Sequence, residues 1–106
     1  MDMSKQVSAD DVHRALGNKD VAIIDVRTSG EFSRGAIMGS INIPVDVIRQ
    51  QIEAAIPDKE KTIYLYCLSG SRSETAAYIL EGLGYTNAYS MTNGLLMWRS
   101  KKYEVV

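Results

Sequence analysis

The sequence has very little cysteine, since Cys67 is the only one among 106 residues. A single cysteine excludes an internal disulfide and any metal site built from several thiolates. An excess of one charge is also missing, because 12 Lys+Arg stand against 13 Asp+Glu and the formal net charge is −1. Without a basic cluster, the chain lacks the electrostatic footprint of a nucleic-acid or membrane binder. We therefore expect no nucleic acid, no membrane and no metal as a partner.

Long apolar runs are absent as well. Runs such as residues 21–24 and 95–98 hold only four residues each, whereas a membrane span needs about 20. Residues 1–6 have no apolar stretch of the kind that a secretory signal contains. Hydrophobic residues make up 45% and charged residues 24% of the chain, which is typical of globular proteins. We expect one cytoplasmic domain over residues 1–106, a monomer without a cofactor.

Apolar patterns along the chain predict alternating strands and helices. Strands are expected at residues 21–24, 40–43, 62–66 and 88–90. Helices are expected at residues 8–16, 45–56, 73–83 and 94–100. The run at 21–24 shows no polar alternation, which is typical of a strand covered on both faces. Strand and helix in alternation favour a parallel sheet with right-handed crossovers, so the predicted fold class is α/β.

The polar loop after the strand at 62–66 has the clearest chemical pattern. Ligands of open parallel sheets bind beyond the carboxyl ends of the strands, and Cys67 stands at such an end, with Arg72 at the start of the next helix. Gly70 permits a backbone turn that points several N–H groups inward, and the helix N-terminus reinforces their field. Ser69 and Ser71 add hydroxyl donors. A thiol in that field is shifted toward thiolate, which is the nucleophile, without a histidine base.

A lone cysteine is more often an inert, buried residue than a nucleophile. The position of Cys67 at a strand end, before a turn that can bind an anion, reverses that preference. Charged residues at the neighbouring strand end, Asp25, Arg27 and Glu31, are interpreted as supports that pair with one another. Arg72 has two interpretations of equal weight. It either stabilises a thiolate or bound anion, or forms a salt bridge to a carboxylate such as Asp25.

Four ordered stretches of the chain resemble the single-domain rhodaneses, which are sulfurtransferases. They are Asp25-Val26-Arg27 with Glu31-Phe32, residues 35–44, the loop 67–72, and Gly94 followed by Trp98. The resemblance covers residues 7–100 and implies a rhodanese-like fold, a five-stranded parallel sheet flanked by helices on both faces. It implies that Cys67 takes sulfane sulfur from thiosulfate or a persulfide, holds it as a persulfide and passes it to a thiol or cyanide. It also implies that the loop residues Leu68, Ser69, Gly70, Ser71 and Arg72 bind the substrate.

Further expectations concern the partners and the departures from the family pattern. The chain has no second cysteine to resolve a persulfide, so the acceptor must be external: a small thiol, thioredoxin or another sulfur-relay protein. Leu68 stands where members that use thiosulfate often have Arg or Lys, so thiosulfate is expected to be a poor donor. Asn93 replaces the first of two glycines, and Asn tolerates the left-handed conformation. Trp98 is expected to close the core and to wall part of the site.

Two alternative functions stay open. The uncharged Leu68 and the small size of the chain also fit a non-catalytic or carrier module that exchanges sulfur only with a bound protein. Related cell-cycle dual-specificity phosphatases and arsenate reductases hold one more residue between cysteine and arginine. They usually have histidine before the cysteine, where this chain has Tyr66. The shorter loop suits one sulfur atom better than a phosphate, so a phosphatase or arsenate reductase is less favoured.

Overall fold

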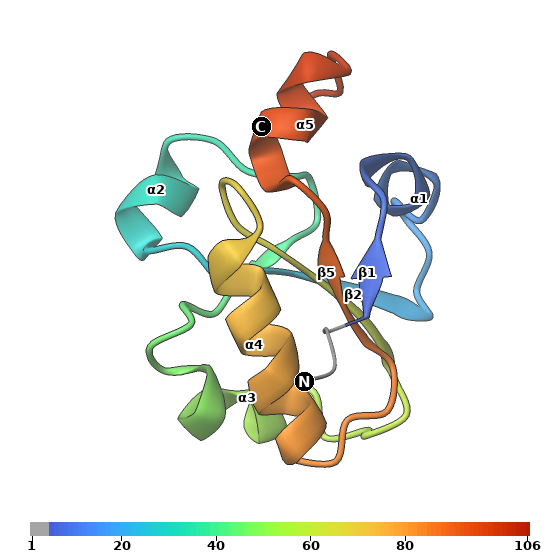
Figure 1. Ribbon diagram of the computed structural model, residues 1–106, viewed down its shortest axis with the longest axis vertical. Helices are drawn as coiled ribbons and strands as arrows, with labels where there is room; N and C mark the ends of the chain where they lie inside the picture. The colour runs from blue at the N-terminus through green and yellow to red at the C-terminus, as the bar shows by residue number, and fades with distance from the viewer. Residues whose placement is uncertain (1–4) are drawn as a thin grey trace.

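The computed structural model describes residues 5–106, which form a five-stranded parallel sheet between two layers of helices (Figure 1). The strands are β1 (Gln6–Val7), β2 (Val21–Asp25), β3 (Ile41–Asn42), β4 (Thr62–Tyr66) and β5 (Ala88–Met91). The helices are α1 (Ala9–Arg14), α2 (Ser29–Ser33), α3 (Ile48–Ala55), α4 (Ser71–Gly82) and α5 (Gly94–Ser100). The strand order is β1-β5-β4-β2-β3, and every pairing is parallel. The predicted α/β class is confirmed.

Helices cover both faces of the sheet, as expected. On one face, α3 and α4 pack over a cluster in which Leu80 is fully buried. On the other face, α1 and α5 pack over a cluster in which Trp98 is fully buried. The consecutive β2 residues Ile23 and Ile24 belong to opposite clusters, because successive side chains of a strand point to opposite faces. The unalternating apolar run at 21–24 therefore arises from burial on both sides.

Most predicted boundaries agree with the structure. β4 and α5 have the predicted bounds, and α4 begins at Ser71, directly after Gly70 as its N-cap. The helix expected at 45–56 is shorter, because residues 45–47 form a turn closed by a hydrogen bond from the Val47 N–H to the Pro44 carbonyl (3.0 Å). Among residues 5–106, no helix is both long enough and apolar enough to cross a membrane. Residues 1–4, which belong to the segment 1–6 that lacks the apolar stretch of a secretory signal, lie outside the described residues.

Two short elements were not predicted. β1 has only two residues, too few for a period to show in the sequence. α2 begins with a capping box in which the Thr28 hydroxyl accepts from the Glu31 N–H and the Glu31 carboxylate accepts from the Thr28 N–H (3.2 and 3.0 Å). The spacing of a threonine and a glutamate three residues later is a known sequence sign of a helix start. That sign could have predicted α2.

The register of the sheet brings two polar loops together at one edge. Asp25 and Tyr66 are Cα partners at the ends of β2 and β4. The Val26 N–H continues the pairing by donating to the Tyr66 carbonyl (2.9 Å). The chain segments that follow the two strands therefore leave the sheet side by side, one toward Arg27 and the other into the loop that begins at Cys67.

Candidate active site

Cys67 follows β4 directly, and its sulfur faces its own loop. The Gly70 N–H donates to Sγ of Cys67 at 3.1 Å. Gly70 has φ of +111°, a conformation that other residues rarely adopt, and this turn is what directs its N–H inward. The predicted need for glycine at this position is confirmed. The Cys67 side chain has no solvent-exposed surface.

Two buried hydroxyl groups lie behind the sulfur. Sγ of Cys67 lies 3.7 Å from Oγ of Ser73, and Oγ of Ser73 lies 2.7 Å from Oγ of Ser90 on β5. Oγ of Ser73 also donates to the Gly70 carbonyl (3.1 Å). Neither serine is more than 1% exposed. Sequence reasoning missed both as site residues, because it assigned Ser73 to the helix and Ser90 to a strand.

Hydrogen bonds around the sulfur shift its acidity. Burial raises the pKa of Cys67, but N–H and O–H donors outweigh burial and leave the pKa below its ordinary value. They are the backbone N–H groups of Ser73, Gly70 and Ser69 and the Ser73 hydroxyl. That hydroxyl accepts from the neutral thiol and donates to the Gly70 carbonyl, and its single proton can turn to the sulfur once the thiol is ionised. Each of these donors binds the charged form more strongly than the neutral thiol. The arrangement therefore favours a thiolate without any histidine contribution.

The start of α5 holds the loop in place. The N–H groups of Leu95 and Leu96 donate to the carbonyls of Cys67 and Leu68, at 2.9 and 3.1 Å. A Cβ on Gly94 would lie 2.4 Å from the Cys67 carbonyl oxygen and 2.5 Å from that of Leu68. These contacts and the φ of +51° require glycine at position 94. Its neighbour Asn93 takes φ of +61°, as predicted for an asparagine at the first glycine position.

Arg72 forms an ion pair with Glu31, and not with Asp25 as suggested from the sequence. Its guanidinium donates to both carboxylate oxygens of Glu31, at 2.8 and 3.2 Å. The hydrogen bond from Arg72, together with those from Thr28, lowers the pKa of Glu31 to about 2. Asp25 pairs instead with Arg27, which follows it closely in the sequence, and is therefore not available to Arg72. The charge of Arg72 at the loop is thus already balanced by a carboxylate.

Asp25 and Arg27 form a second, buried pair. Nη2 of Arg27 lies 2.7 Å from Oδ2 of Asp25 and also donates to the Gly35 carbonyl at 2.7 Å. The exposed fractions of the two residues are 0% and 4%. Burial lowers the pKa of Arg27, but the hydrogen bond to Asp25 outweighs it and keeps this pKa above its usual value. The prediction that these charges pair with each other is confirmed for Asp25 and Arg27.

The remaining predicted residues lie in different surroundings. Ser69 and Ser71 are exposed at the outer side of the loop, and Leu68 is half-buried against the cluster beneath α1 and α5. Trp98 is fully buried in that same cluster, and its Nε1–H donates to the Glu104 carbonyl at 2.9 Å. Cys67 belongs to the cluster on the opposite face. The structure therefore places Trp98 in the core, as predicted, in the cluster against which Leu68 of the loop packs.

Among residues 5–106, no three His, Cys, Asp or Glu side chains gather in a way that could hold a metal ion. The groups available for chemistry at this edge of the sheet are one polarised sulfur, backbone N–H donors, two buried hydroxyls and a paired guanidinium. Such a set can support nucleophilic attack by sulfur and can stabilise negative charge on it.

Comparisons with known proteins agree with this arrangement. The family model described as "Rhodanese-like domain" matches residues 8–101. The chain is 37% identical over 99 residues to "Putative thiosulfate sulfurtransferase, mitochondrial" of Schizosaccharomyces pombe, covering 83% of this chain and 70% of that protein. It is 33% identical over 103 residues to the tRNA uridine(34) hydroxylase of Yersinia pestis, covering 92% of this chain but only 29% of the hydroxylase.

Solved structures give the same result. The rhodanese-related protein of Thermoplasma volcanium superposes with a TM-score of 0.82 at 30% identity, covering 96% of this chain and 97% of that one. The human single-domain sulfurtransferase TSTD1 also superposes with a TM-score of 0.82, at 25% identity, covering 92% and 97%. Together with the family match over most of the sequence, these similarities show that the chain belongs to the rhodanese-like domain family.

Proposed function

We propose that this chain is a sulfurtransferase that carries sulfane sulfur on Cys67. The observation that supports the proposal most strongly is the 3.1 Å hydrogen bond from the Gly70 N–H to Sγ of Cys67. It indicates that the sulfur is a group that the loop is built to polarise, since an inert core cysteine has no need of N–H donors. The similarity to sulfurtransferases supports the same conclusion.

In the first half-reaction, the Cys67 thiolate attacks the outer sulfur of a donor persulfide. A new S–S bond forms on Cys67 while the S–S bond of the donor breaks. The bonding electron pair leaves with the donor, which departs as a thiolate and takes a proton from water. The N–H groups of Ser69, Gly70 and Ser73, which lower the pKa of Cys67, stabilise the negative charge before and after transfer.

In the second half-reaction, an external thiolate attacks the outer sulfur held on Cys67. The S–S bond to Cys67 breaks, and Cys67 leaves as a thiolate that the same donors stabilise. Because Cys67 is the only cysteine in the sequence, no thiol of the chain can compete with the external acceptor. The two half-reactions together return Cys67 to its starting state, which is a double-displacement mechanism.

The charges near the loop favour a persulfide over thiosulfate as the donor. Arg72 is engaged by both carboxylate oxygens of Glu31, and Leu68 brings no charge to the loop. Leu96, whose N–H bonds the Leu68 carbonyl, is 55% exposed. A dianion such as thiosulfate therefore meets no unpaired cationic side chain on the loop of Cys67. A donor with an organic group attached to its persulfide can bury that group against these leucines.

A turnover assay with two donors tests the proposal. Purified protein is given glutathione persulfide or thiosulfate, with cyanide as the acceptor, and thiocyanate is measured. We expect Cys67-dependent turnover that is faster with glutathione persulfide. The Cys67→Ser variant keeps the shape of the loop and should be inactive. Equal thiocyanate formation by the variant and the parent protein would refute the role of Cys67.

A carrier that exchanges sulfur only with a bound protein is the second candidate. The complete burial of Cys67 favours it, because a bound partner protein could move the loop and expose the sulfur. This candidate predicts no turnover with either small donor but sulfur exchange with a persulfidated protein such as thioredoxin. Brisk turnover with glutathione persulfide in the assay above rejects it.

A further inference from the structure

Strand β2, which lies between β4 and β3 in the sheet, has an edge that is partly unpaired. β2 pairs with β4 along its whole length, from Val21 to Asp25. Its pairing with β3 covers only Ile24 and Asp25. The amino-terminal part of β2 therefore has no ladder partner on the β3 side. Unpaired strand edges are places where another extended chain can add hydrogen bonds.

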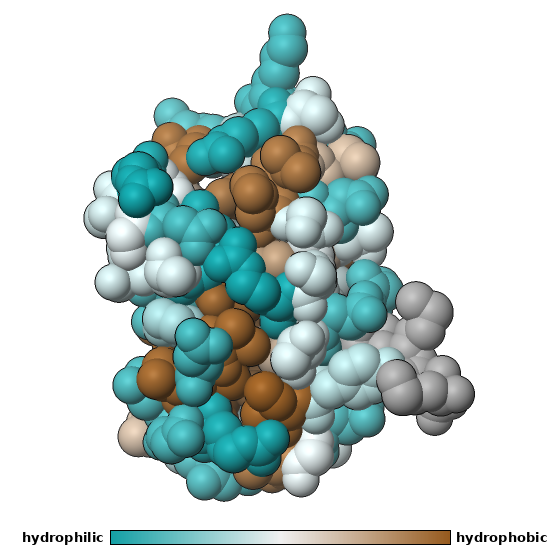
Figure 2. Space-filling view, turned by 60° about the vertical axis from the view of Figure 1, so that its left-hand side comes forward, coloured by the Kyte–Doolittle hydropathy of each residue, from teal (hydrophilic) through white to brown (hydrophobic). Residues whose placement is uncertain are grey.

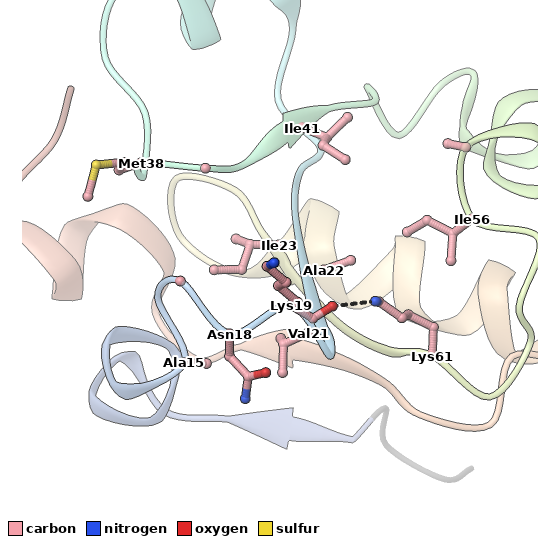
Figure 3. A pocket seen from close by; sticks show the side chains of 13 residues that line it. Ala15, Asn18, Lys19, Val21, Ala22, Ile23, Met38, Ile41, Ile56 and Lys61 are labelled. Atoms are coloured by element: carbon pink, nitrogen blue, oxygen red, sulfur yellow. Dashed lines mark hydrogen bonds between the residues drawn. The ribbon is translucent and has the colours of Figure 1, made fainter.

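A hollow of about 420 Å³ lies along this unpaired edge (Figure 3). Val21 and Ile23 of β2 line one side, and Met38, Ile41 and Ile56 line the other. Met38 is 56% exposed and Ile41 is 47% exposed, which are high values for large apolar side chains. The lining therefore offers apolar surface to water directly beside the part of β2 that has no ladder partner on the β3 side. A small ligand site and a peptide groove both have this character.

The charges around the hollow have one sign. Lys19 and Lys61 are the only ionisable side chains among its lining residues. Nζ of Lys61 donates to the Lys19 carbonyl at 2.6 Å, which holds the two residues together at one end (Figure 3). The chain as a whole has net charge −1, so this local excess of positive charge is a feature of the hollow. It favours an occupant that carries acidic groups.

A second hollow extends the first around β3. It has a volume of about 490 Å³ and lies between β3 and α3. Ile41 and Ala55 line both hollows. Figure 2 shows apolar side chains gathered in patches on a face that is otherwise largely polar. The two hollows together run along β2 and around β3, a shape that suits an extended segment better than a compact small molecule.

We infer that the unpaired edge of β2 binds an extended segment of a partner protein, with alternating apolar side chains and acidic residues at one end. The segment adds a short strand beside Val21 and Ile23, places its apolar side chains against Met38 and Ile41, and sets its acids near Lys19. The site lies at the amino end of β2, about 13 Å along the strand from the end next to Cys67. A partner held there leaves the loop of Cys67 free for sulfur exchange.

A titration followed by nuclear magnetic resonance tests this inference on the full chain. The probe is a synthetic acetylated peptide amide with two aspartates followed by alternating valine and threonine. We expect saturable shifts of the amide signals of Val21, Ile23 and Ile41, and little change at Gly70. Lys19→Glu should weaken binding about two- to fivefold, the contribution of one exposed ion pair. The matched variant Lys102→Glu, outside the hollow, should not.

The inference fails if the peptide gives no saturable shifts at millimolar concentration. It also fails if a peptide with two lysines in place of the aspartates binds equally well, or if the same signals shift with protein concentration alone, which would indicate a second copy of the chain. Because none of these readouts depends on sulfur transfer, failure here leaves the proposed function of Cys67 untouched. Loss of turnover in the assay above likewise leaves the docking site untouched.

Discussion

Replacing Ser73 by alanine should make the Cys67 thiol less acidic. The hydroxyl of Ser73 lies 3.7 Å from Sγ and is among the groups that lower the pKa of Cys67. A hydrogen bond to a charged group contributes about 1.5–3 kcal/mol, and about 1.4 kcal/mol corresponds to one pKa unit. Because the contact is long, we take the lower value and expect the pKa to rise by about one unit.

The expected change in reactivity is smaller than the change in thiolate population. At a pH below the pKa of the thiol, a rise of one unit reduces the thiolate fraction about tenfold. A more basic thiolate is also a better nucleophile, with a Brønsted coefficient of about 0.4–0.5. The two effects together predict that alkylation of Cys67 at pH 7 slows about threefold to fourfold, while the limiting rate at high pH increases.

The assay is the rate of alkylation by iodoacetamide as a function of pH, from which the pKa of Cys67 is read directly. Ser90→Ala is the informative companion variant. It removes the partner of the Ser73 hydroxyl but leaves Ser73 in place (Oγ to Oγ, 2.7 Å), so the pKa should rise less. Thr75→Ala removes an exposed hydroxyl of α4 that bonds only the Ser71 carbonyl and should leave the pKa unchanged.

Thermal unfolding of each variant separates a local effect from a loss of folding. The Ser73 variant removes one of two hydrogen bonds to the Gly70 carbonyl, which keeps the bond from the Glu74 N–H (3.0 Å), so the loss of stability should be about 0.5–1.5 kcal/mol. It should still be folded at 25 °C. An unchanged pKa in a folded Ser73→Ala protein would refute the idea that buried hydroxyls stabilise the thiolate, and so would a larger rise in Ser90→Ala.

Three further predictions follow from the same site. Gly94→Ala should strongly destabilise the fold in urea unfolding, because the added Cβ meets two carbonyl oxygens. Gly82→Ala is the control: its Cβ meets open space on a helical backbone, so the variant should be more stable by up to about 1 kcal/mol. Asp25→Asn leaves the buried charge of Arg27 without a counter-charge and should cost about 3–5 kcal/mol in the same assay. Glu31→Gln should raise turnover with thiosulfate, because it frees the guanidinium of Arg72 from its carboxylate partner. The pKa of Glu31 is lowered from 4.5 to about 2, so the contribution of its charge to folding stability is present above pH 4.5 and is lost as the pH falls toward 2. This part of the acid unfolding should be absent in the variant.

Much of the fold could be predicted from the sequence, because the buried face of a helix or strand requires apolar residues at regular spacing. β4 and α5 were predicted with their observed bounds, since both are short apolar segments between clear polar or glycine boundaries. The two-residue strands β1 and β3 are harder to predict. Their bounds depend on hydrogen bonding to β5 and β2, and not on the pattern of their own residues. α2 was overlooked although the capping pair of Thr28 and Glu31 marks it.

The candidate site was predictable only as far as neighbours along the chain determine it. The turn at Gly70 and its donors to Cys67 follow from local spacing. The pairing of Arg72 with Glu31 does not, because 41 residues separate them. The sequence suggested Asp25 as a partner of Arg72, but Asp25 pairs with Arg27. Contacts between hydroxyls on α4 and β5 likewise depend on how the crossover packs, which no sequence period encodes.

The intact mass of the protein after treatment with glutathione persulfide tests the central claim most directly. The account predicts that the parent protein gains the mass of one sulfur atom, that cyanide or a reducing thiol removes it, and that Cys67→Ala gains none. A gain of equal size in Cys67→Ala, or no gain in the folded parent protein with persulfide and protein donors alike, would contradict it.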